Sequence, residues 1–280
     1  MNNILKHILK IVVLTSTYMC VSHASPGQLE INHICATQLG CFSGDTPGYP
    51  VTIDGSAGRS YIFSGDLSIP DLNVAGIKIN VADISIDLNG FKIIRAGCQD
   101  GSCATNSDGH GIDSPSVSKG LSIKNGSIIG MGGIGLLLGS NAVVEDMYVT
   151  LNGDSGLQLG DGARVINCSV THNTLSGITV GNGSYVAHNT VNNNIDTGII
   201  VGLGSTVINN AVFLQGQNGI VANEGALIQG NTIRNNFNNG LVIARDGAYR
   251  NNVFSVNINS NITGAGFNAG GNSCAGSLCP

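Results

Sequence analysis

One short stretch of the chain contains three aspartates and a histidine: Asp100, Asp108, His110 and Asp113. Carboxylates can bind calcium, and carboxylate and imidazole groups can act as general acid and base. Asp108, His110 and Asp113 are therefore candidate catalytic residues, and Asp100 is a candidate binding residue with calcium as its cofactor. Aspartate is also common in solvated loops because its side chain stabilises turns. We favour this structural interpretation of the stretch.

The elements that must position these residues follow a repeat of 21 residues. Six glycines recur at this spacing, each before an apolar residue: Gly135, Gly156, Gly177, Gly198, Gly219 and Gly240. Two further columns are apolar, namely Val144, Val165, Val186, Val207, Ile228 and Tyr249, and Ile128, Val149, Val170, Val191, Val212, Ile233 and Phe254. A period near 20 with short β-like segments is typical of solenoids. We predict an all-β fold, a single-stranded parallel β-helix with coils of about 21 residues stacked about 4.8 Å apart.

Asparagines form columns in the same register. One column contains Asn189, Asn210, Asn231 and Asn252; a second contains Asn152, Asn173, Asn194, Asn236 and Asn257, interrupted by Gln215. Asparagine tolerates the left-handed backbone of a sharp turn, and stacked amides can donate and accept along a column. We interpret these residues as structural, with glycan or ligand binding as the alternative.

The composition agrees with this fold class. The chain has 280 residues with 41 glycines, 42% apolar residues and 10% charged residues, where about 25% charged is usual. The apolar content argues against disorder, and the glycine and asparagine content argues against a helical fold. A net charge of −5 without a basic run argues against nucleic-acid binding.

The first residues resemble an export signal. Lys6 and Lys10 precede the apolar run 11–14, and Ser22-His23-Ala24 offers small residues for cleavage before Ser25. We predict a signal peptide over 1–24, a cap region over 25–50, a parallel β-helix over 51–270 and a disulfide-pinned end over 271–280. The apolar run is too short to span a bilayer. We expect a secreted or periplasmic protein without a membrane span in its mature chain.

The cysteines fit an exported protein. Six of them fall into close pairs, Cys35 with Cys41, Cys98 with Cys103 and Cys274 with Cys279. In an oxidising compartment such spacing indicates three short-loop disulfides. The spacing does not suit a metal site, and we predict none. Cys168 takes a place in the first asparagine column, where we expect an inward-facing free thiol.

The N-terminal half is less regular. Asn89-Gly90 matches Asn125-Gly126, but the two are 36 residues apart. We expect an inserted loop of about 15 residues near 96–110, which would carry the Cys98–Cys103 pair and the candidate aspartates.

The repeated Asn-x-Val/Ile and Gly-Ile/Leu-x-Val/Leu elements resemble the right-handed parallel β-helix repeats of the pectin-lyase-like superfamily. The segments Ile34–Asp45, Ile86–Phe91 and Cys274–Pro280 resemble a group of secreted bacterial β-helix proteins of unassigned activity. The resemblance covers nearly all the mature chain. It implies a right-handed helix, whereas the fold serves lyases, hydrolases, epimerases, adhesins and inert scaffolds alike.

Three enzyme types were weighed against the residues. A pectate-lyase-like site needs acids and a base on the first strand, whose outward column carries neither: Leu137, Gln158, Thr179, Ile200, Val221 and Val242. Gly109-His110-Gly111 matches one polygalacturonase-like motif, but Asp-Asp and Arg-x-Lys are absent, as is the Asp-Pro-His-Asp of alginate epimerases.

Two functions remain. We expect a secreted module of non-catalytic or uncharacterised activity that presents an extended surface to a polysaccharide or a cell-surface partner. The alternative is a polysaccharide lyase or glycoside hydrolase that acts on an acidic polysaccharide through the inserted loop.

Overall fold

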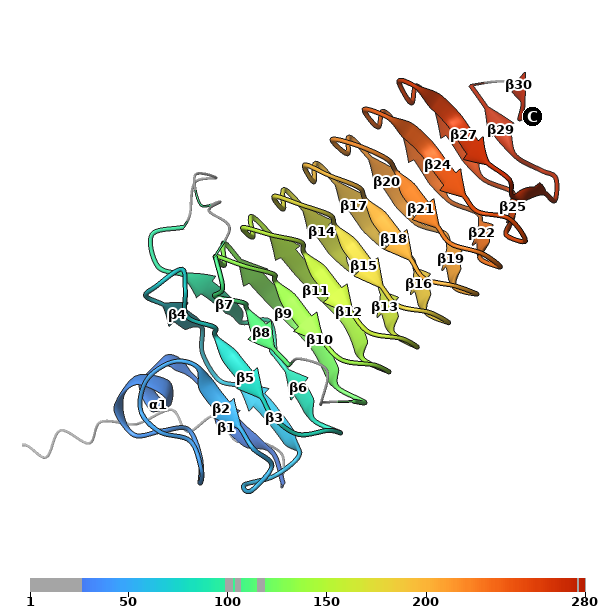
Figure 1. The fold of residues 1–280 in the computed structure, drawn as a ribbon. Helices are drawn as coiled ribbons and strands as arrows, with labels where there is room; N and C mark the ends of the chain where they lie inside the picture. The colour runs from blue at the N-terminus through green and yellow to red at the C-terminus, as the bar shows by residue number, and fades with distance from the viewer. Residues whose placement is uncertain (1–26, 99–102, 104–106, 115–118, 276, 280) are drawn as a thin grey trace, which may run out of the picture.

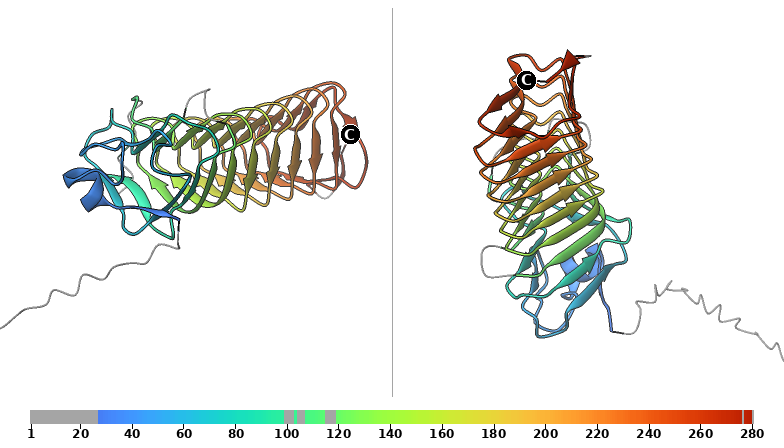
Figure 2. Two further views of the ribbon diagram at one scale, coloured as in Figure 1. Left: turned by 90° about the horizontal axis from the view of Figure 1, so that it is seen from below. Right: turned by 90° about the vertical axis from the view of Figure 1, so that its right-hand side faces the viewer.

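The computed structural model describes residues 27–98, 103, 107–114, 119–275 and 277–279. They form a rod of stacked coils, with the N-terminal and C-terminal parts at opposite ends (Figures 1 and 2). The predicted signal peptide, 1–24, lies outside the described residues. No helix in the described part of the chain has the length and apolarity needed to cross a bilayer.

One strand of each coil joins a ten-stranded parallel sheet. Its strands are β2 (Val51–Ile53), β5 (Ile77–Ile79), β8 (Ile112–Asp113), β10 (Leu136–Leu138), β12 (Leu157–Leu159), β15 (Ile178–Val180), β18 (Ile199–Val201), β21 (Ile220–Ala222), β24 (Asn239–Ile243) and β27 (Ser260–Gly264). Leu157 is paired with Ile178, and Ile178 with Ile199, so the predicted 21-residue coil is confirmed.

The other two strands of each coil form a second, bent sheet of 20 strands. The middle strands are β3 (Ser60–Phe63), β6 (Ser85–Asp87), β13 (Arg164–Ile166), β16 (Tyr185–Ala187), β19 (Thr206–Ile208), β22 (Leu227–Gln229), β25 (Ala248–Arg250) and β28 (Phe267–Asn268). The last strands are β4 (Leu67–Ile69), β7 (Lys92–Arg95), β14 (Ser169–Thr171), β17 (Thr190–Asn192), β20 (Ala211–Phe213), β23 (Thr232–Arg234), β26 (Val253–Ser255) and β29 (Ser273–Cys274). Two longer strands, β9 (Ser122–Ile129) and β11 (Val143–Thr150), run through both positions.

Apolar columns fill the interior of the rod. Strand side chains alternate, and the inward ones are β-branched or leucine in most coils. Val186, Val207 and Ile228 stack in one column and are fully buried. Each coil therefore completes its core only against its neighbours, as expected for a solenoid.

The glycine column marks a place where the coils touch closely. A Cβ added to Gly177 would lie 2.5 Å from Cγ1 of Val191 and 2.7 Å from the carbonyl oxygen of Gly198. Glycine is required there because a side chain would overlap the next coil.

Both asparagine columns form hydrogen-bonded ladders inside the rod. The Nδ2 atoms of Asn189, Asn210 and Asn231 each donate to Oδ1 of the asparagine one coil further on, at 3.0 Å. Asn152 and Asn173 do the same in the second ladder, at 2.9 Å. The ladder asparagines are buried, which leaves them to satisfy one another.

The expectation that ladder asparagines adopt the left-handed backbone was wrong. Positive φ angles occur at the residues that precede them, such as His188 (59°) and Asn209 (56°), and not at Asn189 or Asn210. The chain turns at the preceding residue, and the turn directs the ladder amide inward.

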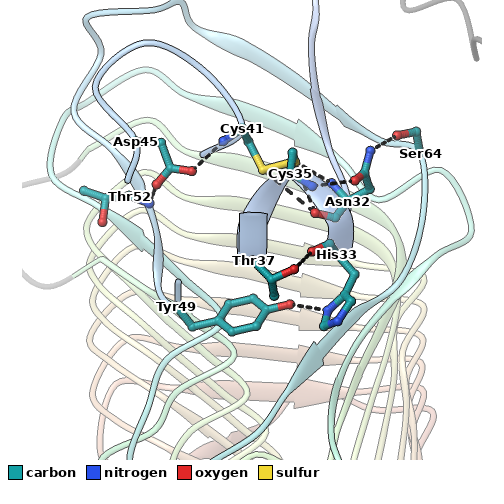
Figure 3. Close-up of a disulfide and its surroundings, with 9 residues drawn as sticks. All are labelled: Asn32, His33, Cys35, Thr37, Cys41, Asp45, Tyr49, Thr52 and Ser64. Carbon is teal, nitrogen blue, oxygen red and sulfur yellow. Dashed lines mark hydrogen bonds between the residues drawn. A yellow bond between two sulfur atoms is a disulfide. The ribbon is translucent and has the colours of Figure 1, made fainter. Parts of the chain in front are cut away.

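The N-terminal end of the rod is closed by a cap (Figure 3). After β1 (Leu29–Ile31), which pairs with β3, Asn32 caps α1 (His33–Gln38) by accepting from the Cys35 N–H at 3.0 Å. The Asp45 carboxylate, itself mostly buried, accepts from the N–H groups of Cys41 (2.8 Å) and Thr52 (3.0 Å). Asp45 thus ties the cap to the first strand of the ten-stranded sheet.

Disulfides hold both ends and the irregular coil. The predicted pairs are present as Cys35–Cys41, Cys98–Cys103 and Cys274–Cys279. At the C-terminal end, β29 also pairs antiparallel with β30 (Ser277–Leu278). Cys168 is free and buried, as expected from its place in the register.

Candidate functional site

The outward face of the ten-stranded sheet is the longest continuous surface that the fold repeats. One outward side chain per coil forms a straight column: Thr52, Lys78, Asp113, Leu137, Gln158, Thr179, Ile200, Val221, Val242 and Thr263. The part from Leu137 to Val242 is the column that the 21-residue spacing predicted. We call the whole column the face column.

The N-terminal part of the face column is charged, contrary to what the sequence indicated. Lys78 and Asp113 are register partners on β5 and β8, one coil before Leu137. Asp113 therefore belongs to a strand of the sheet and not to the inserted loop. Lys78 is exposed and Asp113 is half-buried, so an ammonium and a carboxylate stand next to each other on this face.

Irregular spacing hid this pair from the sequence. Ile77 and Ile112 are partners 35 residues apart, and Ile112 and Leu136 are partners 24 residues apart. The alternation Ile77-Lys78-Ile79 was the available signal, since a lysine between two inward isoleucines must point outward.

His110 lies beside this face, in the turn that leads into β8. Its Nδ1 atom accepts the N–H of Ile134 at 3.0 Å, so a neutral His110 carries its proton on Nε2. The side chain fits over Gly133, where an added Cβ would come within 2.5 Å of Nδ1. His110 thus holds the neighbouring coil and keeps one nitrogen, Nε2, outside that contact.

The Gly109-His110-Gly111 tripeptide has a packing explanation. Gly111 takes the place of the repeat glycine in its coil, and an added Cβ would lie 2.4 Å from the carbonyl oxygen of Gly135. Gly109 is similarly close to the Leu72 carbonyl, at 2.3 Å. The two glycines are required by contacts between coils.

The remaining loop candidates do not join a cluster in the described structure. Asp108 is exposed, and Asp100 lies outside the described residues. Among the residues that are described, no three His, Cys, Asp or Glu side chains are placed to hold one metal ion. The extra residues are placed mainly between β7 and β8, where 19 positions separate Ile93 from Ile112 instead of the 8 between Ile128 and Leu136.

A shallow pocket of about 250 Å³ opens at the edge of the face, next to the charged pair. It is formed where β10 and β12 end, by Leu137, Gln158 and the turn residues Gly139, Ser140 and Gly160. Apolar side chains beside an amide and a hydroxyl suit a ligand that has both apolar and hydrogen-bonding faces.

Cys168 is not part of a reactive site. Its side chain is 2% exposed, and burial raises the pKa of its thiol to about 12. A thiol is nucleophilic as the thiolate, so this cysteine is inert at neutral pH.

Solved structures share the architecture. The tailspike protein 2 enzymatically active domain of bacteriophage CBA120 is 13% identical with a TM-score of 0.52, over 90% of this chain and 48% of that one. The periplasmic alginate epimerase AlgG is 14% identical, with a TM-score of 0.49 over 88% and 68% of the two chains. The A-module of the Azotobacter vinelandii mannuronan C-5 epimerase AlgE4 is 12% identical, with a TM-score of 0.34 over 88% of each. At these identities the likeness concerns the fold alone, and this chain spans less than half of the tailspike domain.

No match to this chain was found among curated proteins. The sequence profile of the right handed beta helix region, by contrast, matches residues 69–213, just over half of the chain. These residues run from β4 to β20, through the coils that carry Lys78, Asp113 and both ladders. The chain therefore belongs to the right-handed β-helix family.

Proposed function

We propose that this protein is an extracytoplasmic module that binds a polysaccharide along the face column. The observation that carries the proposal is the form of that column, which places one side chain per coil in a straight line along the rod. Neighbouring side chains are one strand spacing apart, about 4.8 Å. A linear polymer can follow such a line and contact several coils at once.

The chemistry of the face column supports a carbohydrate. The column changes from charged residues through Gln158 and Thr179 to the half-buried Ile200, Val221 and Val242. Sugar rings have apolar faces and polar edges, so they suit a surface that presents aliphatic side chains beside amide and hydroxyl groups. The three disulfides support a location outside the cytoplasm, since such bonds persist in oxidising compartments.

Binding is tested by placing a charge on the face column. Affinity electrophoresis against neutral and acidic polysaccharides, with and without calcium, identifies the ligand. Thr179→Arg, on β15, should then weaken binding at least tenfold because it puts a long cation into the contact line. Thr190→Arg, exposed on β17 of the other sheet, is the matched control and should bind normally. Equal affinities in the two variants would rule out this face as the binding surface.

The Lys78–Asp113 pair favours a second function, a polysaccharide lyase or hydrolase. A carboxylate can act as general base or nucleophile, and an adjacent ammonium can stabilise negative charge that develops on the substrate. Unsaturated products and new reducing ends should be measured in the same incubations. Product formation that is abolished in Asp113→Asn and Lys78→Met, but kept in Lys92→Met on β7, would establish catalysis at this pair. Binding without product would leave the module non-catalytic.

A further inference from the structure

A hollow of about 370 Å³ lies between the N-terminal cap and the last strand of the first coils. His33 and Thr37 of α1 line it on one side, and Tyr49 lies in the loop that enters β2. Ser68 of β4 and, after it, Pro70 and Val74 complete the wall. The volume lies within the range of small-molecule sites.

The polar groups of the hollow converge on one pair. His33 Nδ1 and the Tyr49 hydroxyl are 2.8 Å apart, and Figure 3 shows the two side chains pointing at each other. Because Nδ1 is engaged, Nε2 of His33 is the ring atom left for a ligand. The Thr37 hydroxyl donates to the His33 carbonyl at 2.7 Å, which fixes the same turn of helix.

The hollow is held in shape without a ligand. The Cys35–Cys41 disulfide closes the loop after α1, and the Gly48 N–H donates to the Ala36 carbonyl at 2.6 Å. Partial burial raises the pKa of Tyr49 to about 12, so its hydroxyl stays protonated through the physiological range. A preformed site loses little conformational entropy on binding.

The lining selects the chemical class of the ligand. Carboxylate, Lys and Arg side chains are absent from the described residues that form this wall, so a charged ligand would find no counter-ion. The Tyr49 ring, Pro70 and Val74 offer an apolar surface, whereas His33 and Ser68 offer hydrogen bonds. Aromatic rings beside a few hydrogen-bonding groups suit a ring with an apolar face and a polar edge.

We propose that this hollow is a binding site for a neutral saccharide of one or two rings, stacked on Tyr49 and hydrogen-bonded to His33 and Ser68. The site is formed by the cap and β4, and it does not use the face column. It therefore stands or falls independently of the polysaccharide surface proposed above.

The test is a titration of the mature protein with neutral mono- and disaccharides at neutral pH, followed by calorimetry. We expect saturable binding of at least one sugar. Val74→Phe, which fills the hollow and leaves the His33–Tyr49 pair intact, should weaken this binding at least tenfold, as should Tyr49→Phe. Tyr185→Phe, on β16, is the matched control and should bind normally.

Melting temperatures separate binding from folding. If Tyr49→Phe loosens the cap, Val74→Phe still tests the site because it keeps every hydrogen bond there. Absence of binding by every neutral sugar would overturn the proposal, as would binding that survives Val74→Phe. Loss of binding in Thr179→Arg with full binding in Val74→Phe would assign the sugar to the face column instead.

Discussion

Asn210 and Asn231 are joined directly across two coils. Nδ2 of Asn210 donates to Oδ1 of Asn231 at 3.0 Å, and the backbone N–H of Asn210 donates to the same oxygen at 2.9 Å. Nδ2 of Asn210 also donates to the Val186 carbonyl at 3.0 Å. One buried amide thereby satisfies groups in three successive coils, which makes the ladder a main source of register.

Asn210→Ala should lower the free energy of unfolding by roughly 3 kcal/mol, because it leaves buried donors of Asn189 without their acceptor. Urea unfolding followed by circular dichroism measures the change. Asn223→Ala is the control: this residue is exposed, and the change should stay within about 0.5 kcal/mol. Similar losses in both variants would show that the ladder is not a special source of stability.

Cys168→Asn should stabilise the protein by about 1 kcal/mol. The Cys168 thiol lies 3.7 Å from the Val144 carbonyl, where the next ladder member, Asn189, donates to the Val165 carbonyl at 3.0 Å. An amide would replace a weak donor by a strong one and extend the ladder by one coil. Thermal melting of Cys168→Asn, with Cys168→Ala for comparison, tests this. A lower melting temperature for Cys168→Asn than for Cys168→Ala would contradict it.

Stability should fall in alkaline solution. Burial raises the pKa of Cys168 from 9.0 to about 12, so between these values the unfolded chain loses a proton that the folded chain keeps. The contribution is complete below pH 9 and is lost as pH rises toward 12, by up to about 1.4 kcal/mol per pH unit. Urea titrations at pH 8 and pH 10.5 should show a smaller loss for Cys168→Ala than for the wild type. Equal losses would mean that other groups cause the effect.

Gly177→Ala should destabilise the protein by about 3 kcal/mol, since the new methyl group overlaps Val191 and the Gly198 backbone. Gly65→Ala is the matched control, because its Cβ would meet only Asn32 Cβ at 3.4 Å, an ordinary contact. Chemical denaturation of both variants decides the matter. A mild effect at Gly177 would show that neighbouring coils can move apart.

Val256→Asn should stabilise the chain by about 1 kcal/mol. Val256 has a φ of 55° and is 69% exposed, so a branched side chain occupies a left-handed position without burial in return. Asn193 and Asn235 hold the equivalent place in other coils, with φ of 53° and 55°. Val253→Asn, on the exposed side of β26, should instead destabilise. Melting curves that move in the same direction for both would refute the backbone explanation.

The regular coils could be predicted because stacking demands the same residue type at the same phase. Val186 and Val207 follow each other for that reason, and their pairing was legible in the spacing. Lys78 and Asp113 were not recognised as partners, because the connections around them differ in length and the 21-residue phase is lost. The sequence also misplaced the left-handed residues by one position, since either residue of a turn can carry the positive φ.

The hollow at the cap had no signal in the sequence at all. His33 and Tyr49 are 16 positions apart, and neither belongs to a repeated column. Their contact depends on how α1 packs against the first coil, which is a tertiary arrangement without a period. The Asp45 carboxylate belongs to the same category: its role depends on two N–H groups, of Cys41 and Thr52, that only the folded cap brings together.

The shared register of the glycine column and both ladders has an evolutionary consequence. Removing residues 177–197 would join Ser176 to Gly198, place Cys168 against Asn210 and Asn173 against Gln215, and leave every other contact pattern in phase. Duplication of the same segment would lengthen the rod by one step of about 4.8 Å. Unequal recombination within the gene can therefore change how many binding units the molecule spans, in whole increments, while the cap at one end and the disulfide at the other are inherited intact.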